Sequence, residues 1–310
     1  MQSIWMVVAA LLFSLMGVAV KLASTQYGIA EIVAYRGLVG LVVMGAIIGV
    51  RARRGGASVI EALSTRHLAM HLRRSISGTA SLSLWFFAIA GLPLATAMTI
   101  NYSSPLFIGA WIAWSALRAG ERIDHAMSIA LLAGFVGVML LLQPSLNADQ
   151  WLFALIGLTS TTLTAVAYLS VKALGRVGEP ETRIVFYFSA LNAAAGLIGA
   201  AFLGFHGHDA RGLGLLMTVG LTGALAQLAV TRAFSASSTL LTANLGYTGI
   251  LFSSAWGYLV FGDRIPLTNG LGMAIIVVSG VTATLMTARA LKRARAEPDE
   301  TVPSPSRQES

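Results

Sequence analysis

Ten apolar runs of about 18 to 24 residues follow one another along the chain, and they constrain its fold more than any other feature. As a helix, each run is long enough to cross the hydrocarbon core of a bilayer, which is about 30 Å thick. Only 11% of the 310 residues are charged and 56% are hydrophobic, which leaves too little charge to cover a water-soluble protein of this size. We therefore predict an all-α integral membrane protein with ten transmembrane helices. The runs are residues 3–22, 30–50, 70–90, 94–117, 125–143, 151–171, 183–204, 212–232, 237–261 and 268–288.

The basic residues fall in alternate loops, as the positive-inside rule describes. With the N-terminus in the cytoplasm, the loops that hold most of the 21 Lys and Arg all face the cytoplasm. These residues include Arg51, Arg53, Arg54, Arg66, Arg73, Arg74, Arg118, Arg122, Lys172, Arg176, Arg183 and Arg232. We predict a multi-pass protein of the cytoplasmic (inner) membrane with both termini cytoplasmic. The formal net charge of +8 is thus explained by the lipid bilayer, and we expect no nucleic-acid partner.

Two distant stretches repeat one pattern, in which a long apolar run ends in Trp, Gly, an acid, Arg and Ile. The stretches are WIAWSALRAGERI at 111–123 and FSSAWGYLVFGDRI at 252–265. Five spans per copy is an odd number, so the second copy enters the membrane from the opposite face and the repeats are inverted. We predict a first five-helix repeat at 1–145, a second at 146–290, and a disordered cytoplasmic tail at 291–310, which is polar and rich in Pro and Ser. Transporters built this way place a substrate site between the repeats, near the bilayer midplane.

With these motifs the sequence resembles the EamA-type family of the drug/metabolite transporter superfamily. The stretch FFAIAGLPLATAMTINYSSPLFIGAWIAW, residues 86–114, is similar to that family's third-to-fourth-span region, where a short Leu-Pro-Leu-Ala link precedes a helix broken near a proline. The resemblance covers about residues 1–290. It implies ten helices in two inverted five-helix repeats and an activity in transport, with amino acids, nucleotide-like metabolites, vitamins and drugs among the family's substrates.

The polar run NYSSP, from Asn101 to Pro105, lies near the centre of the fourth span. A polar group without a partner there costs several kcal/mol, so these side chains face protein or water. Asn101, Ser104 and Trp111 share one helix face, and Pro105 frees the carbonyl of Asn101 from its backbone hydrogen bond. We expect a kinked helix whose face, together with Tyr102, lines a substrate cavity. The alternative is that Ser and Asn hold helices together.

Four other spans supply further candidates for that cavity. The ninth offers a polar face opposite small residues, and the resemblance implies that the third and eighth spans complete the site. Interfacial anchoring is the alternative for any Trp. In the sixth span we expect the hydroxyls to bond their own helix's carbonyls rather than line the cavity. The candidates outside the fourth span are Ser81 and Trp85 in the third, Gln227 in the eighth, and Asn244 and Tyr247 in the ninth.

Arg36 lies about six residues inside the second span and is the remaining candidate. It could snorkel outward, pair with Glu31, or hold an anionic substrate in the cavity. None of the 13 acidic residues lies near a span centre, so a proton-exchanging carboxylate is missing at mid-depth. This favours facilitated diffusion or exchange, although coupling through Glu31 stays open.

We therefore predict a secondary transporter that moves a small polar or amphipathic metabolite, such as an amino acid, vitamin, nucleotide-like compound or drug, by alternating access. The alternative is a flippase or a membrane-embedded enzyme acting on a lipid-linked substrate. The acid, Arg and His cluster at 121–125 is the place for such an enzyme's site, but a solvated cytoplasmic turn explains it better. No HExxH, GxSxG or Walker pattern occurs, and the chain has no Cys, so we predict no catalytic residue, cofactor or metal. Monomer and homodimer both remain open.

Overall fold

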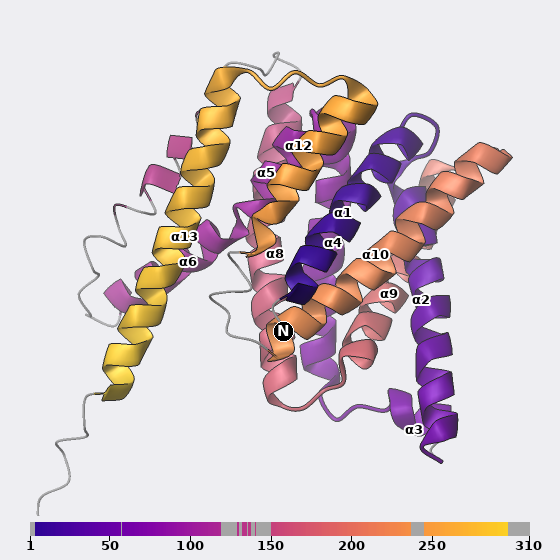
Figure 1. Cartoon of the computed structure of the whole chain (residues 1–310). Helices are drawn as coiled ribbons and strands as arrows, with labels where there is room; N and C mark the ends of the chain where they lie inside the picture. Colours follow the sequence, from indigo (N-terminus) through magenta and orange to yellow (C-terminus); the bar gives the residue numbers. More distant parts are fainter. Residues whose placement is uncertain are drawn as a thin grey trace, which may run out of the picture.

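The computed structural model describes residues 4–56, 58–118, 129, 132–134, 136–137, 140, 150–236 and 245–296, and every element in these ranges is a helix (Figure 1). The helices are α1 (Ile4–Ala23), α2 (Ile29–Arg54), α3 (Val59–Leu63), α4 (Leu68–Gly91), α5 (Leu94–Tyr102), α6 (Ser104–Arg118), α8 (Gln150–Arg176), α9 (Glu181–Leu203), α10 (Ala210–Ala236), α12 (Thr248–Phe261) and α13 (Leu267–Ala296).

Among the described residues, five helices are long and apolar enough to cross a membrane: α1, α2, α8, α9 and α10. The α4 helix has similar length, but its two adjacent arginines and its serines make it less apolar. The α12 helix and the first part of α13 are shorter apolar helices. This confirms the predicted class of an all-α membrane protein. Most of the predicted fifth span, the start of the ninth and residues 297–310 of the tail lie outside the described residues. Residues 291–296, which we assigned to the disordered tail, continue α13 as a helix.

The predicted break in the fourth span is present, because α5 ends at Tyr102 and α6 begins at Ser104. The Ser103 N–H donates to the Thr99 carbonyl at 3.0 Å, and the helix restarts as the Leu106 N–H donates to the Ser103 carbonyl at 2.9 Å. The Ile100 carbonyl, one residue before the Asn101 carbonyl that we expect Pro105 to free, accepts a hydrogen bond from a neighbouring helix. Its partner is the Thr161 hydroxyl of α8, at 2.8 Å.

The main helix packing joins the first half of the chain to the second. The α1 helix packs on α10, α4 on α8, α2 on α9 and α5 on α12. These pairings are symmetric between the two halves. When each helix of the first half is exchanged with its counterpart in the second, the same pairs result. The counterparts are α1 and α8, α2 and α9, α4 and α10, and α5 and α12, and the further packing of α1 on α12 and of α5 on α8 obeys the same exchange. Such a pattern is that of two inverted repeats wrapped around a pseudo-two-fold axis.

At the centre of this arrangement α2 and α9 cross at backbone contact. A Cβ atom on Gly37 would lie 2.1 Å from the backbone nitrogen of Ala193, and one on Gly196 would lie 2.3 Å from the nitrogen of Ala34. The contact is reciprocal, since each helix presents an Ala and a Gly three residues apart. Small residues let membrane helices approach this closely, so these two glycines set the distance between the halves.

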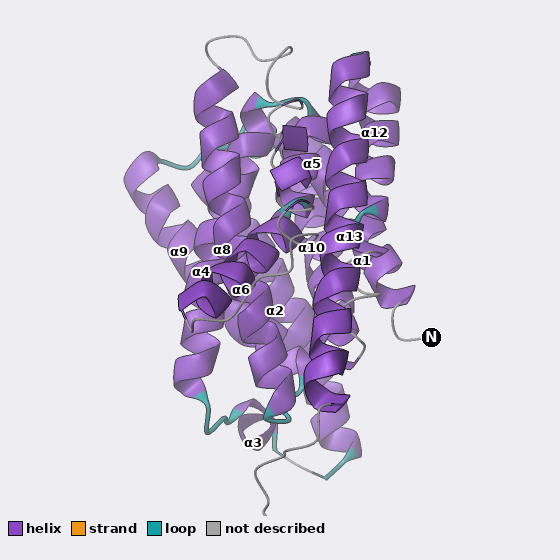
Figure 2. Cartoon of the chain, turned by 90° about the vertical axis from the view of Figure 1, so that its left-hand side faces the viewer, coloured by secondary structure: helices purple, strands orange, loops and turns teal. Residues whose placement is uncertain are grey.

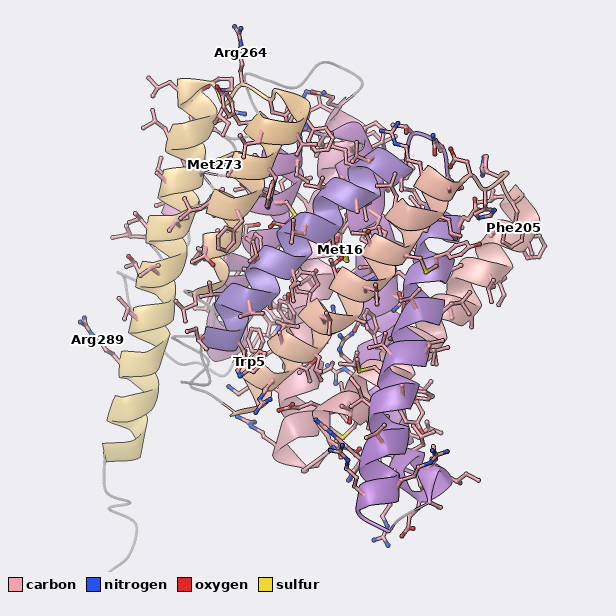
Figure 3. All side chains as sticks on the ribbon, turned by 45° about the vertical axis from the view of Figure 1, so that its right-hand side comes forward. Trp5, Met16, Phe205, Arg264, Met273 and Arg289 are labelled. Carbon is pink, nitrogen blue, oxygen red and sulfur yellow. The ribbon has the colours of Figure 1, made fainter. Side chains whose placement is uncertain are left out.

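Most of the helices run alongside one another, and the connections gather at two ends (Figure 2). One end carries α3, and we call it the α3 end. The opposite end carries the connections between α1 and α2 and between α9 and α10. Figure 3 places Phe205 and Arg264 near this opposite end and the fully buried Met16 in the middle of the molecule.

Candidate functional site

A cavity of about 40 Å³ lies inside the bundle, between helices from both halves of the chain. Its apolar wall includes Phe13, Leu82 and Phe188. One water needs roughly 10–15 Å³ of such space, whereas small-molecule pockets begin at roughly 300 Å³. In this conformation the cavity is large enough for a few waters, and a metabolite requires it to widen. The polar side chains on its wall are Arg74, Ser81, Trp85, Asn101, Tyr102, Thr164, Tyr168 and Gln227.

Half of the ten predicted site residues lie together on this wall: Ser81, Trp85, Asn101, Tyr102 and Gln227. They come from three helices. The break between α5 and α6 directly follows Tyr102, so the irregular backbone lies beside the cavity, where membrane proteins tolerate it.

The other predicted residues lie elsewhere. Arg36 contacts the Phe188 ring from outside the cavity wall. Ser104 is buried next to the helix break, and Tyr247 is buried just before α12. Trp111 is 59% exposed and packs against Trp114 with ring centroids 5.1 Å apart. The structure does not bring Trp111 to the cavity. Asn244 lies outside the described residues.

The hydroxyls of α8, the sixth predicted span, form two groups. We expected all of them to bond carbonyls of their own helix, and only one group does so. Thr159, Thr162 and Ser170 donate to carbonyls of their own helix, as expected. Ser160 and Thr164 instead bond across to other helices. This expectation was therefore wrong for the inward face of α8, which forms a wall of the cavity.

A chain of hydroxyls joins α4, α8 and α5 at the cavity. The Ser81 hydroxyl lies 2.6 Å from that of Thr164 and donates to the Ser160 carbonyl at 3.0 Å. The Ser160 hydroxyl donates back to the Ser81 carbonyl at 2.8 Å. Thr164 also donates to Asn101 Oδ1 at 3.3 Å. Asn101 is therefore held from the second half of the chain, across the boundary between the predicted repeats.

Arg74 is a residue of the cavity wall that we missed, because we assigned it to a cytoplasmic loop. The structure instead buries it in the cavity wall, with 2% of its surface exposed, while its neighbour Arg73 points outward. Its guanidinium donates to Gln227 Oε1 at 3.0 Å and lies 4.1 Å from the Phe188 ring centroid. The available signal was its position four residues inside the predicted third span, where an arginine is a functional candidate by default.

The α3 end is closed by contacts between the two halves. The carboxylate of Glu179, between α8 and α9, accepts from the Thr65 hydroxyl at 2.5 Å and from Arg183 at 2.9 Å. His71 Nε2 lies 3.3 Å from the same carboxylate. Burial acts to raise the pKa of Glu179, but the contacts with Thr65, Arg183 and His71 outweigh it, and its pKa lies below the ordinary value. Arg183 also donates to the Ala62 carbonyl, which extends the link to the segment before α4.

The opposite end holds a matching contact. The Glu31 carboxylate is fully buried, 3.0 Å from His206 Nδ1 and 3.2 Å from His208 Nε2. Tyr27 stacks on the His208 ring at a centroid distance of 5.3 Å. Here too a carboxylate of one half meets histidines of the other. Glu31 therefore pairs with His206 and His208 rather than with Arg36. Within the described part of the chain, no group of three His, Asp or Glu is arranged to hold a metal ion.

Comparisons with known proteins agree with this architecture. Residues 1–143 match the EamA-like transporter family. The pseudopaline exporter of Pseudomonas aeruginosa (strain UCBPP-PA14) is 34% identical over 275 residues, covering 87% of this chain and 92% of the exporter. The riboflavin transporter of Vibrio cholerae is 27% identical over 296 residues, covering 94% of this chain and 96% of that transporter. The family and these relatives are named as transporters rather than enzymes.

One protein of known crystal structure shares the fold along nearly the whole chain. It superposes with a TM-score of 0.66, covers 93% of this chain and 98% of its own, and is 17% identical in sequence. At that identity the likeness concerns the fold alone.

Proposed function

The chain belongs to the EamA-like transporter family, and from this premise we propose that it is a secondary transporter moving a small polar or amphipathic metabolite across the inner membrane by alternating access. Its substrate site is the central cavity. The observation that carries the proposal is this cavity itself, since polar side chains lie on its wall inside a bundle of apolar helices and the wall comes from both halves of the chain.

The contacts at the two ends support an alternating mechanism. Each end is held by a carboxylate and histidine contact that joins one half to the other, through Glu179 and His71 at the α3 end and Glu31 with His206 at the opposite end. A rocking motion of one half against the other has to break one of these contacts while the other stays. On the predicted orientation, the α3 end faces the cytoplasm and both termini are cytoplasmic.

The packing supports the division of the chain into repeats at 1–145 and 146–290, because its helix pairs map onto one another when the two sets are exchanged. The hydroxyl chain through Ser81, Thr164 and Asn101 then acts as a joint between the repeats at the depth of the cavity. Transport proceeds as facilitated diffusion or exchange, because the described carboxylates lie at the two ends rather than beside the cavity.

The test is an untargeted comparison of metabolites in cytoplasm and spent medium from cells expressing the wild type or Asn101→Leu at matched membrane levels. Thr159→Val, at an exposed position of α8, serves as the control. A compound enriched in the medium with the wild type and the control, but not with Asn101→Leu, identifies an exporter; one enriched inside identifies an importer. If the three strains show no difference across several growth conditions, the metabolite-carrier proposal fails.

A further inference from the structure

Two arginines are buried side by side inside the bundle, and neither has a carboxylate partner in the part of the chain that the structure describes. Arg36 of α2 and Arg74 of α4 are each 2% exposed. Their guanidinium carbons lie 4.9 Å and 4.1 Å from the centroid of the same ring, that of Phe188 on α9. Nε and Nη2 of Arg36 and Nε and Nη1 of Arg74 have no hydrogen-bond partner there.

This arrangement is unfavourable for the protein on its own. A buried charge without a counter-charge is strongly destabilising, and two like charges on one ring also repel each other. The face of Phe188 attracts both cations but cannot neutralise either of them. Charged groups at this depth in membrane proteins are found where they serve a ligand or ion path.

The space around Arg74 is shaped for its guanidinium. A Cβ atom on Gly78, one turn along α4, would lie 2.1 Å from Arg74 Nη1 and 2.9 Å from the Phe188 ring. The absence of a side chain at Gly78 therefore leaves the room that the guanidinium occupies. The Oε1 atom of Gln227, on α10, accepts a hydrogen bond from Arg74 Nη2, and this bond orients the guanidinium.

The cavity wall also carries other donors that lack acceptors. The Trp85 indole N–H and the Tyr102 hydroxyl are buried and have no hydrogen-bond partner among the described residues. Both residues, like Arg74, line the same small space. Such a set of donors is complementary to a group that only accepts hydrogen bonds and carries negative charge.

We propose that the cavity recognises its solute through a carboxylate, which Arg74 binds directly and Arg36 stabilises through its positive field from behind Phe188. The proposal rests on the transport function above and specifies the class of substrate. A guanidinium matches a carboxylate in a planar, two-pronged geometry, and Trp85 and Tyr102 add two unpaired donors to the same wall. Phe13 and Phe188 contact the apolar part of the solute.

The test uses the purified full-length chain in detergent, with its apparent melting temperature as the readout. The probes are carboxylates and their neutral amides, benzoate against benzamide and glutarate against glutaramide, together with phenyl phosphate. The variants are Arg74→Gln, Arg36→Gln and Gly78→Ala. Arg73→Gln is the matched control, because it removes the same charge from the adjacent, exposed position of α4.

We expect the carboxylates to stabilise the wild type and Arg73→Gln saturably, and the amides to leave both unchanged. Arg74→Gln should need at least tenfold more carboxylate than the wild type for the same rise in melting temperature. Arg36→Gln should also need more carboxylate than the wild type, but less than Arg74→Gln. Gly78→Ala should weaken the response although it keeps both charges. Without a ligand, Arg74→Gln should melt at a temperature equal to or above that of the wild type, whereas an arginine with a merely structural role would lower it on removal.

Equal stabilisation by carboxylates and amides overturns the proposal, as does a wild type that no carboxylate stabilises. If phenyl phosphate stabilises the protein and the carboxylates do not, the recognised group is a phosphate, and the proposed class of substrate is wrong. Flux of a neutral solute that Arg74→Gln leaves intact overturns this inference while the transport function stands. Carboxylate binding that requires Arg74, in a protein without measurable flux, sustains the inference while the transport function fails.

Discussion

Thr164 connects two polar groups of the cavity wall, one from each neighbouring helix. Its hydroxyl lies 2.6 Å from that of Ser81 and donates to Asn101 Oδ1 at 3.3 Å. Thr164→Val keeps the shape and removes both bonds, each worth about 1 kcal/mol. We predict a fall of about tenfold in flux per folded protein, measured in proteoliposomes with the solute that the metabolite comparison identifies.

Thr162 provides the control for this prediction. It lies two residues away on α8, is exposed, and donates only to a carbonyl of its own helix at 3.2 Å. Thr162→Val should therefore transport like the wild type. If the two variants lost flux equally, the loss would belong to α8 as a whole and not to the cavity.

Glu179 makes the stability of the α3 end depend on pH. Since the pKa of its carboxyl is lower in the folded protein than the ordinary 4.5, its contacts stabilise the fold in full above that value and are lost as the pH falls through the folded pKa. We predict that Glu179→Gln lowers the apparent melting temperature by a constant amount between about pH 7 and about pH 5.5, and that the deficit shrinks below about pH 4.5.

The matched variant for Glu179 is Glu61→Gln, at an exposed position of α3. Its melting temperature should follow that of the wild type at every pH. A deficit of Glu179→Gln that stayed unchanged down to about pH 3 would contradict the assignment, because the carboxylate would then not be the group that titrates.

At the residue scale, the sequence alone indicated Asn101, because an unpaired polar group is costly near the centre of a span. Ser81 and Gln227, which also line the cavity, were candidates only because the resemblance implied that the third and eighth spans complete the site. The inward hydroxyls of α8 were not, because a Thr that bonds its own helix and one that bonds across to another look alike in sequence. Arg74 was missed since a basic residue near a span end also satisfies the positive-inside rule.

Among the elements, the crossing of α2 and α9 depends on two glycines. Gly37→Ala places a Cβ atom 2.1 Å from the Ala193 backbone, where no side chain can yield. We predict that the free energy of unfolding falls by about 1 to 3 kcal/mol or more, seen as a lower apparent melting temperature and less monodisperse protein in detergent.

Gly49 lies on the same helix, and a Cβ atom added to it would have nothing within 4 Å, so it is the natural comparison. Gly49→Ala should be neutral or raise stability by up to about 1 kcal/mol, because alanine favours a helix over glycine. If Gly37→Ala and Gly49→Ala lowered the stability equally, the close contact between α2 and α9 at Gly37 would not be needed for stability.

The helices themselves were largely predictable, because apolar runs of span length leave few other structures. The break before Pro105 was predictable too, since proline removes a backbone donor. The pairing of α2 with α9 was not, because glycines and alanines occur on many helices and only three-dimensional packing selects Gly37 and Gly196 for backbone contact.

For the molecule as a whole, the two end contacts predict that closing either end permanently stops transport. The chain has no Cys, so introduced thiols are the only ones present. We predict that a short, reducible dithiol crosslinker abolishes flux in Glu31→Cys with His206→Cys and, separately, in Thr65→Cys with Glu179→Cys, and that reduction in the same vesicles restores it.

The four single-cysteine variants are the controls, and their flux should not respond to the crosslinker. Continued flux with one end fully crosslinked would show that the halves do not move apart at that end. The outcome at the α3 end and at the opposite end can differ, so the two pairs test the two contacts independently.

The uncompensated arginines have a kinetic consequence for the transport cycle. If a bound carboxylate neutralises Arg36 and Arg74, the loaded protein passes through its closed state more easily than the unloaded one, and the return of the unloaded protein becomes the slow step. Uptake of a labelled carboxylate into vesicles preloaded with the unlabelled compound should then outpace uptake into empty vesicles, and in Arg74→Gln the two rates should converge. Such a protein works as an antiporter: it trades one anion for another, and the direction of net movement follows from whichever anion the cell accumulates.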